Sequence, residues 1–283
     1  MPQPTSPGDY ADFYRQSIAP DTREAFWLEQ ARAIDWHQAP QQACDYHNPP
    51  FARWFADGQL NLCHNAVDRH LAQRADQPAI IAVSTETNTE RVYTFAQLHE
   101  EVQRMAAVLQ SFGVGKGDRV QIYMPMIAEA AFAMLACVRL GAIHSVVFGG
   151  FASVSLASRI DDAQPKVVIS ADAGSRGGKA IAYKPLLDEA LQLAKHKPAA
   201  VLLVDRGLAP MPLQAGRDHL WSTLRTQPQF SEAKVPCTWL NSSDPSYILY
   251  TSGTTGKPKG VQRDTGGYAV ALASSMQHIF AGQ

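Results

Sequence analysis

The residues with the clearest capacity for chemistry lie between positions 251 and 260. These ten positions hold four hydroxyl residues, three glycines and two lysines. Phosphate oxygens bind such groups, because glycine lets backbone N–H groups approach closely, hydroxyls donate further hydrogen bonds and lysine adds positive charge. The segment is therefore predicted to bind phosphate, with contacts from Thr251, Ser252, Gly253, Thr254, Thr255, Gly256, Lys257 and Lys259.

Two other interpretations of this segment are weighed against phosphate binding. Clusters of Gly, Ser and Thr are often only polar loops between elements. The Walker A loop of mononucleotide ATPases needs glycine five residues before the Gly-Lys pair and Ser or Thr after the lysine. Those positions are Thr251 and Pro258, so the Walker A pattern fails twice.

A second candidate for anion binding is the sequence Ser175-Arg176-Gly177-Gly178-Lys179. Arg176 and Lys179 flank two glycines, which suits an anion clamp, although such residues are more often solvated surface charges. His144 could be a general base, but a satisfied buried histidine is the favoured interpretation. Asp161 and Asp162 are neighbours on a predicted helix, so they point apart and are expected only to solvate its end.

These candidates are positioned by alternating strands and helices. A hairpin is expected from the β-prone runs 79–84 and 91–94. An amphipathic helix should follow, because Thr94 and Gln97 form a capping-box pattern, apolar residues recur at spacings of three and four, and Gly113 ends the pattern. Further strands are predicted at 119–124, 143–148, 166–170, 200–204 and 246–250, with helices at 126–140, 153–163 and 183–195 and a loop at 205–218. This pattern predicts an α/β fold, a layered parallel sheet with helices on both faces.

The composition sets the class of protein. The chain has 283 residues, 46% hydrophobic and 18% charged, so it can bury a sizeable core. A formal net charge of -1 lacks the basic excess that duplex nucleic acids attract. We expect no nucleic acid partner, no membrane span, no secretory signal and a cytoplasmic location. The four cysteines form no C-x-x-C pair, so neither a metal site nor a disulfide framework is expected.

The segment Tyr250 to Gly260 resembles the phosphate-binding motif of the adenylate-forming superfamily, which includes acyl-CoA synthetases, luciferases and peptide-synthetase adenylation domains. The resemblance implies that this loop closes over the ATP phosphates while a carboxylate attacks the α-phosphorus. The products would be an acyl-adenylate and pyrophosphate.

Other segments are similar to the acetyl-CoA and propionyl-CoA synthetases within that superfamily. The likeness covers nearly the whole chain and includes Phe26-Trp27, Ile34-Asp35-Trp36, Asn61 to His70, Val147 to Phe151, Arg159-Ile160 and Ser175 to Lys179. The residues Gln262-Arg263-Asp264 and Gly266-Gly267-Tyr268 look closer to propionate–CoA ligases, so propionate is favoured over acetate. A non-catalytic structural or nucleotide-binding module remains the alternative from another class.

The resemblance also assigns sites. It implies that coenzyme A is contacted by Arg176, Gly177, Gly178 and Lys179, with Gly149 and Gly150 nearby, and that ATP and Mg²⁺ are further requirements. Acetate enzymes often have arginine where this chain has Lys179, so the charge is kept and the bidentate geometry is lost. The oligomeric state is not predicted.

The resemblance divides the chain as well. Residues 1–70 are expected to be the N-terminal extension of these synthetases, and 71–283 an incomplete AMP-binding domain that ends just after the phosphate loop. The catalytic residues, the acyl pocket and the C-terminal domain are expected beyond Gln283. The chain by itself is therefore expected to be inactive.

Overall fold

The computed structural model describes residues 7–251 and 258–280. Contacts divide the chain into two compact units. The first unit comprises residues 1–65, 239–245 and 263–283, and the second comprises 66–238 and 246–262. The predicted phosphate-loop residues Ser252 to Lys257 lie outside the described residues.

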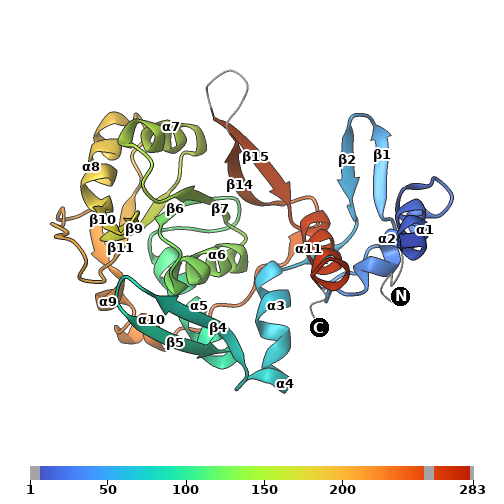
Figure 1. Cartoon of the computed structure of the whole chain (residues 1–283), viewed down its shortest axis with the longest axis horizontal. Coiled ribbons are helices and arrows are strands. Elements are labelled where there is room, and N and C mark those ends of the chain that lie inside the picture. The colour runs from blue at the N-terminus through green and yellow to red at the C-terminus, as the bar shows by residue number, and fades with distance from the viewer. Residues whose placement is uncertain (1–6, 252–257, 281–283) are drawn as a thin grey trace. The chain divides into compact units, whose positions relative to one another are not determined.

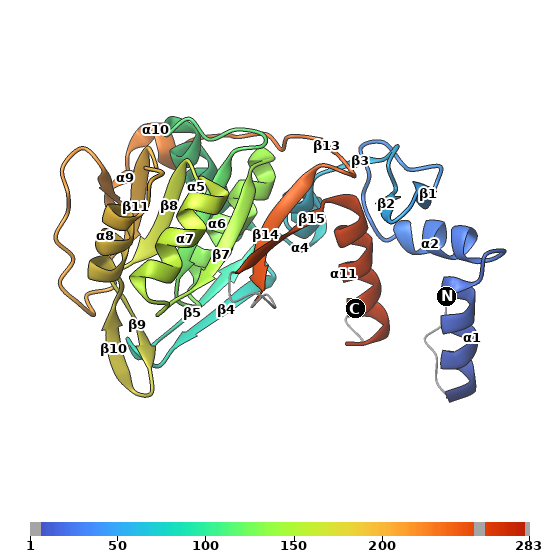
Figure 2. The same cartoon turned by 90° about the horizontal axis from the view of Figure 1, so that it is seen from above.

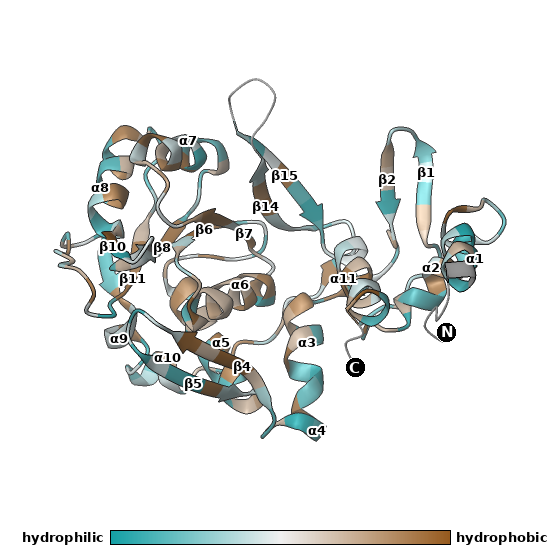
Figure 3. Ribbon diagram, viewed as in Figure 1, coloured by the Kyte–Doolittle hydropathy of each residue, from teal (hydrophilic) through white to brown (hydrophobic). Residues whose placement is uncertain are grey.

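The second unit is built on a sheet of seven strands (Figure 1). Their order across the sheet is β12 (Asp218–Leu220), β11 (Ala200–Val204), β8 (Val167–Ala171), β6 (Arg119–Met124), β7 (Ile143–Phe148), β14 (Pro245–Thr251) and β15 (Lys259–Asp264). All pairs from β12 through β14 are parallel. Figure 3 shows the middle strands as largely hydrophobic, as expected of strands that are covered on both faces.

Helices cover both faces of this sheet, as the sequence predicts (Figures 1 and 2). On one face α5 (Phe95–Ser111) packs against α6 (Ala128–Leu140), and on the other α7 (Ser153–Ala163) packs against α8 (Tyr183–Leu193). The capping box is confirmed, since Thr94 Oγ1 accepts from the Gln97 N–H and Gln97 Oε1 accepts from the Thr94 N–H. Helix α6 ends at Gly141, whose φ of 71° suits glycine.

The order of the strands defines where a ligand can bind. The chain passes from β6 to the adjacent β7 through α6, then crosses to β8 on the other side of β6 through α7. Successive crossovers thus run on opposite faces of the sheet. Such a switch leaves a crevice beyond the carboxyl ends of the strands concerned.

Shorter elements complete the second unit. The hairpin of β4 (Pro78–Ser84) and β5 (Thr89–Thr94) confirms the predicted one, and a second hairpin pairs β9 (Ala173–Arg176) with β10 (Lys179–Ala182). The second hairpin was not predicted, and neither was β12 at the end of the predicted loop. Four short helices are η1 (Asp68–His70), α4 (Leu71–Arg74), α9 (Trp221–Leu224) and α10 (Pro228–Ser231).

The first unit combines α1 (Pro7–Ile18), α2 (Arg23–Ala31), β1 (Cys44–Asn48), β2 (Phe51–Trp54), β3 (Gln59–Leu60), α3 (Leu62–Ala66), β13 (Leu240–Asn241) and α11 (Gly266–His278). Its core contains Phe55 and Val270, with Trp27, Trp36 and Trp54 packed around them. Phe55 and these three tryptophans therefore anchor the core of the first unit, whereas Phe51 of the same region is 70% exposed. Among the described residues, no helix is long and apolar enough to cross a membrane.

Candidate functional site

A pocket of about 610 Å³ lies at the carboxyl ends of β6 and β7, where the order of the strands predicts a crevice. The segment Met124 to Ile127 that follows β6 forms one wall, and Val146 to Gly150 of β7 and its turn form another. The remaining lining comes from Val83 to Glu86, Ser175, Ile181, Tyr183 and Leu249. The pocket is therefore lined by five residues of the two glycine-rich segments singled out in the sequence: Val147, Phe148, Gly149, Gly150 and Ser175.

The double-glycine turn after β7 is held from behind by two tyrosines. A Cβ on Gly149 would lie 2.0 Å from Tyr183 Oη, so only glycine fits there without a rearrangement. Gly150 has a φ of +98°, which favours glycine for conformational reasons. Tyr123 Oη accepts a hydrogen bond from the Gly150 N–H at 3.3 Å and donates one to the Phe151 carbonyl at 3.2 Å. Burial raises the pKa of both phenols, so they remain protonated at neutral pH.

The Arg176 to Lys179 segment is a tight β-hairpin turn rather than an irregular loop. Arg176 pairs with Lys179 at the end of β9 and β10, and Gly177 and Gly178 have φ values of 59° and 76°. Positive φ at both central residues is what a type I′ turn requires. Lys179 is exposed, as a residue that meets a ligand from solvent must be.

The same tyrosine links this hairpin to the double-glycine turn. A Cβ on Gly174 would lie 2.1 Å from Tyr183 Oη, the atom that also excludes a side chain at Gly149. The phenol thus sits against two glycine backbones, one at the end of β7 and one in β9. The double-glycine turn and the β9–β10 hairpin therefore share this tyrosine. Ser175 and Ile181 of the hairpin line the pocket, whereas Gly177, Gly178 and Lys179 are not among its described lining residues, so their contact with coenzyme A stays a prediction.

The base of the predicted phosphate loop is formed by β14 and β15. Thr251, the last residue of β14, is exposed, and its Oγ1 donates to the carbonyl of Lys259 at 3.5 Å. Lys259 is exposed at the start of β15. Thr251 therefore lies immediately before the segment 252–257, and Lys259 lies two residues after it.

Two carboxylates of α7, Asp161 and Asp162, form hydrogen bonds with distant parts of the chain, and one of them supports this base. Asp162 accepts a hydrogen bond from Tyr250 Oη at 2.6 Å, and Asp161 accepts one from the His196 N–H at 2.9 Å. The prediction that these carboxylates only solvate the helix end is wrong. Burial, then the hydrogen bond to Asp162, raises the pKa of Tyr250 well above its usual value, so the phenol remains a donor.

A charged cluster borders the pocket beside Glu86. The Arg206 guanidinium binds the carboxylate of Glu86 at 2.5 Å and lies 3.6 Å from that of Asp172, which is fully buried. Asp172 also accepts from the backbone N–H groups of Ala173 and Leu208. This network ties the tip of the β4–β5 hairpin to the start of β9.

His144 is not positioned as a general base. Its ring stacks on Tyr247 with centroids 5.7 Å apart, and burial lowers the pKa of the imidazole to about 4. Nδ1 is buried and has no hydrogen-bond partner among the described residues. The prediction that this histidine is buried is therefore confirmed, and the prediction that its ring is satisfied by hydrogen bonds is wrong for this nitrogen.

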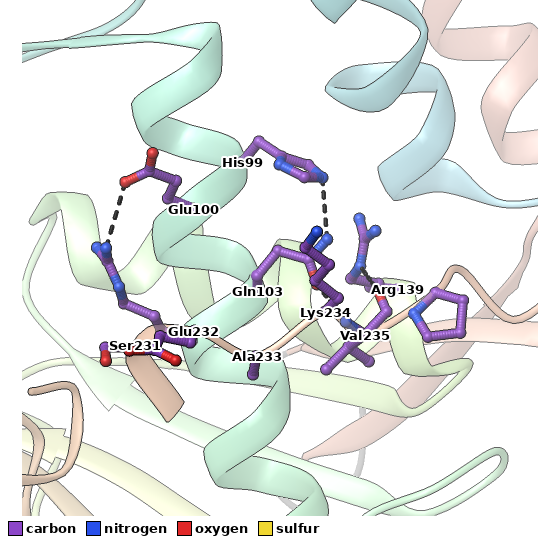
Figure 4. A pocket seen from close by; sticks show the side chains of 11 residues that line it. His99, Glu100, Gln103, Arg139, Ser231, Glu232, Ala233, Lys234 and Val235 are labelled. Atoms are coloured by element: carbon purple, nitrogen blue, oxygen red, sulfur yellow. Dashed lines mark hydrogen bonds and ion pairs between the residues drawn. The ribbon is translucent and has the colours of Figure 1, made fainter. Parts of the chain in front are cut away.

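Another pocket, of about 560 Å³, lies along α5 and contains none of the predicted site residues (Figure 4). Figure 4 shows His99 hydrogen-bonded to Gln103, with the side chain of Arg139 beside them. Arg139 binds Asp68 through two contacts of 2.9 Å and donates to the Val235 carbonyl at 2.6 Å. These groups are engaged with the protein itself and anchor the segment 231–236 that forms the other wall.

Comparison with known proteins identifies the family. Residues 67–283 match the family model described as AMP-binding enzyme. The chain belongs to this AMP-binding enzyme family. Residues 10–66 match the model described as acetyl-coenzyme A synthetase N-terminus. The resemblance to acetyl-CoA and propionyl-CoA synthetases is thereby confirmed.

Individual members of the AMP-binding family are similar over almost the whole chain. A propionate–CoA ligase from Escherichia coli is 60% identical over 274 residues, which cover 97% of this chain and 43% of that protein. The human mitochondrial acyl-CoA synthetase short-chain family member 3 is 44% identical over 97% of this chain and 40% of that protein. The chain thus spans less than half the length of these curated relatives.

A solved structure confirms the predicted fold class. The acetoacetyl-CoA synthetase from Streptomyces lividans superposes with a TM-score of 0.84 at 27% identity. The match covers 97% of this chain and 41% of that one. The parallel sheet with helices on both faces is therefore the fold of this family.

The sequence alone did not point to Tyr123, Tyr183 or Asp162 as residues that shape the site. Each acts on a glycine-rich turn or loop base that is distant in the chain, for example Tyr250, which is 88 residues from Asp162. The tyrosines carried a weak signal, because a polar hydroxyl in a buried position needs a partner.

Proposed function

We propose that this chain forms part of an ATP-dependent ligase that joins a short-chain carboxylate, propionate in preference to acetate, to coenzyme A. The observation that carries the proposal is the 60% identity to a propionate–CoA ligase over 97% of this chain. The crevice at the strand ends, lined by the double-glycine turn and by Ser175 and Ile181 of the β9–β10 hairpin, supports it. ATP with Mg²⁺, the carboxylate and coenzyme A would be the small-molecule reactants, and the cytoplasm would be the location.

The proposed reaction has two half-reactions. In the first, a carboxylate oxygen attacks the α-phosphorus of ATP, the bond to the pyrophosphate oxygen breaks, and acyl-adenylate and pyrophosphate form. In the second, the sulfur of coenzyme A attacks the acyl carbonyl carbon, AMP leaves, and the thiol proton passes to solvent. The phosphate loop from Thr251 to Lys259 would serve the first step by stabilising the charge that develops on the phosphates.

The second half-reaction would use the β9–β10 turn. Arg176, Gly177, Gly178 and Lys179 are proposed to hold the phosphates of coenzyme A, with Gly149 and Gly150 lining the path of its chain. The type I′ turn supports this role, because it leaves the backbone bare of side chains between two cationic residues. We also propose that residues 1–70 form the family's N-terminal extension and 71–283 part of its AMP-binding domain.

The half-reactions can be measured separately in the full-length protein. Replacing Arg176 or Lys179 with alanine should leave propionate-dependent exchange of pyrophosphate into ATP nearly unchanged. Each substitution removes a charge-assisted contact of about 1.5 to 3 kcal/mol, so the KM for coenzyme A should rise about ten- to a hundredfold. Replacing Lys257 or Thr254 should instead weaken the exchange reaction first.

The same assays decide between the alternatives. Exchange that is faster with acetate than with propionate would favour an acetate–CoA ligase. Absence of exchange with any short-chain carboxylate would favour a non-catalytic module. If Arg176→Ala and Lys179→Ala weaken exchange as much as thioester formation, the assignment to coenzyme A is wrong.

A further inference from the structure

One arginine of α7 lies between the double-glycine turn and the base of the predicted phosphate loop. The guanidinium carbon of Arg159 is 4.7 Å from the ring centroid of Phe151 and 5.3 Å from that of Tyr250. Phe151 directly follows Gly150, and Tyr250 directly precedes Thr251. A single cation therefore contacts one aromatic ring of each segment.

Arg159 is itself firmly held. The residue is 7% exposed, and its Nη1 donates to the Ser155 carbonyl at 2.8 Å, one turn earlier in α7. A desolvated guanidinium on an aromatic face gains more from the contact than an exposed one. The cation is thus fixed to the helix and attracted to both rings.

The backbone at Phe151 and the ring of Tyr250 are each held by further contacts. Tyr123 holds the Phe151 carbonyl and the Gly150 N–H through one hydroxyl. Asp162 holds the Tyr250 hydroxyl, and a Cβ on Gly260 would lie only 3.3 Å from Cε1 of Tyr250, so β15 packs against the same ring. A shift of the Tyr250 ring must therefore displace Arg159 or break one of these contacts, and a shift of the backbone at Phe151 must break the hydrogen bonds of Tyr123.

We propose that Arg159 is a positioning residue that couples the double-glycine turn to the base of the phosphate loop. This inference rests on the proposed function, in which the loop serves adenylation and the turn serves coenzyme A. Coupling of two sites is reciprocal for binding. A change at Phe151 should therefore alter the binding of ATP, although Phe151 belongs to the turn that borders the coenzyme A path.

The test compares variants of the full-length protein. Arg159→Met keeps an unbranched, flexible side chain and removes the cation, and Arg159→Lys keeps the charge and loses the planar stacking. The matched control is Arg119→Lys, because Arg119 donates to the carbonyls of Ala163 and Gln164 at the C-terminal end of α7 and stacks on neither Phe151 nor Tyr250. The measured quantities are the KM for ATP in pyrophosphate exchange and the KM for coenzyme A in thioester formation.

Arg159→Met should raise both Michaelis constants about tenfold, because the variant has no cation to interact with the two aromatic rings. Arg159→Lys should give a smaller increase, and Arg119→Lys should change neither constant. A general loss of folded protein would instead lower kcat by one common factor and leave both Michaelis constants unchanged, which overturns the proposal. Phe151→Leu retains the Arg159 side chain but removes one of the two rings that it contacts, and gives a second test. It should raise the KM for ATP, and an effect on coenzyme A alone refutes the coupling.

A measurement on the 283-residue chain separates this inference from the proposed function. In Phe151→Leu, the backbone ¹⁵N–¹H resonances of Thr251 and Lys259 should shift, whereas Arg119→Lys should leave them in place. Unshifted resonances in Phe151→Leu refute the coupling whatever the enzyme does. A full-length protein without exchange activity refutes the proposed function, and the resonance shifts still decide the coupling.

Discussion

Replacing Gly149 with alanine should destabilise the fold through a clash with a specific hydroxyl group. The new Cβ would lie 2.0 Å from Oη, 2.5 Å from Cζ and 2.7 Å from Cε2 of Tyr183. An ordinary van der Waals contact is about 3.5 Å, so the ring would have to retreat by about 1.5 Å. It cannot do so easily, because Tyr183 is 4% exposed and Oη lies equally close to the backbone of Gly174. Overpacking of this kind costs about 1 to 3 kcal/mol, and we expect the upper end.

Urea denaturation of the 283-residue chain measures this cost and its origin. In a Tyr183→Leu background the phenol is gone, so Gly149→Ala should cost less than about 1 kcal/mol. Gly150→Ala is the matched control, since a Cβ there meets no heavy atom within 4 Å but the φ is +98°. It should cost about 1 to 2 kcal/mol in both backgrounds, because the penalty is conformational.

The two double-mutant cycles that share Tyr183→Leu should therefore differ: the cost of Gly149→Ala depends on the tyrosine, and the cost of Gly150→Ala does not. The reasoning is refuted if Tyr183→Leu fails to relieve Gly149→Ala, or if it relieves Gly150→Ala to the same extent. A changed m-value would mean that the compactness of the folded or denatured state had changed, and the free energies would then have to be compared at a common urea concentration.

Two further predictions concern buried charge. Burial lowers the pKa of His144 from 6.5 to about 4, so its contribution to the free energy of unfolding is fully present above about pH 6.5 and is lost as the pH falls toward 4. His144→Gln should remove up to about 3 kcal/mol of this pH dependence. An unchanged dependence on pH in urea titrations of the variant contradicts the assignment. Arg139→Met should lower the free energy of unfolding by about 3 to 5 kcal/mol, because it leaves the Asp68 carboxylate without its bidentate partner. Adding Asp68→Asn should restore part of that stability. Equal stability of the single and double variants would show that the ion pair is not the cause.

The sequence predicted the central architecture because its signals are local. The capping box of Thr94 and Gln97 and the apolar spacing after it are contained within α5, and the glycine at 141 marks the end of α6 without reference to the rest of the chain. The hairpin of β9 and β10 escaped prediction, since its strands are four residues each and the glycines between them suit a loop equally well.

The candidate site was predictable only in part, for a related reason. Glycine, hydroxyl and lysine groups that bind phosphate are recognisable by composition within one segment. The prediction for Asp162 was wrong because it considered only neighbours on the same helix, whereas the partner is Tyr250, which β14 brings to α7 from 88 residues away. Register between distant strands is not readable from a single segment.

The tyrosines show why such supporting residues are needed at all. The double-glycine turn is proposed to border the path of coenzyme A, and glycine gives a backbone more conformational freedom than any other residue does. Rigidity has to be supplied from the buried side, where Tyr123 bridges the Gly150 N–H and the Phe151 carbonyl and Tyr183 fills the space behind Gly149 and Gly174. Substitutions at these phenols should therefore loosen the turn that they hold.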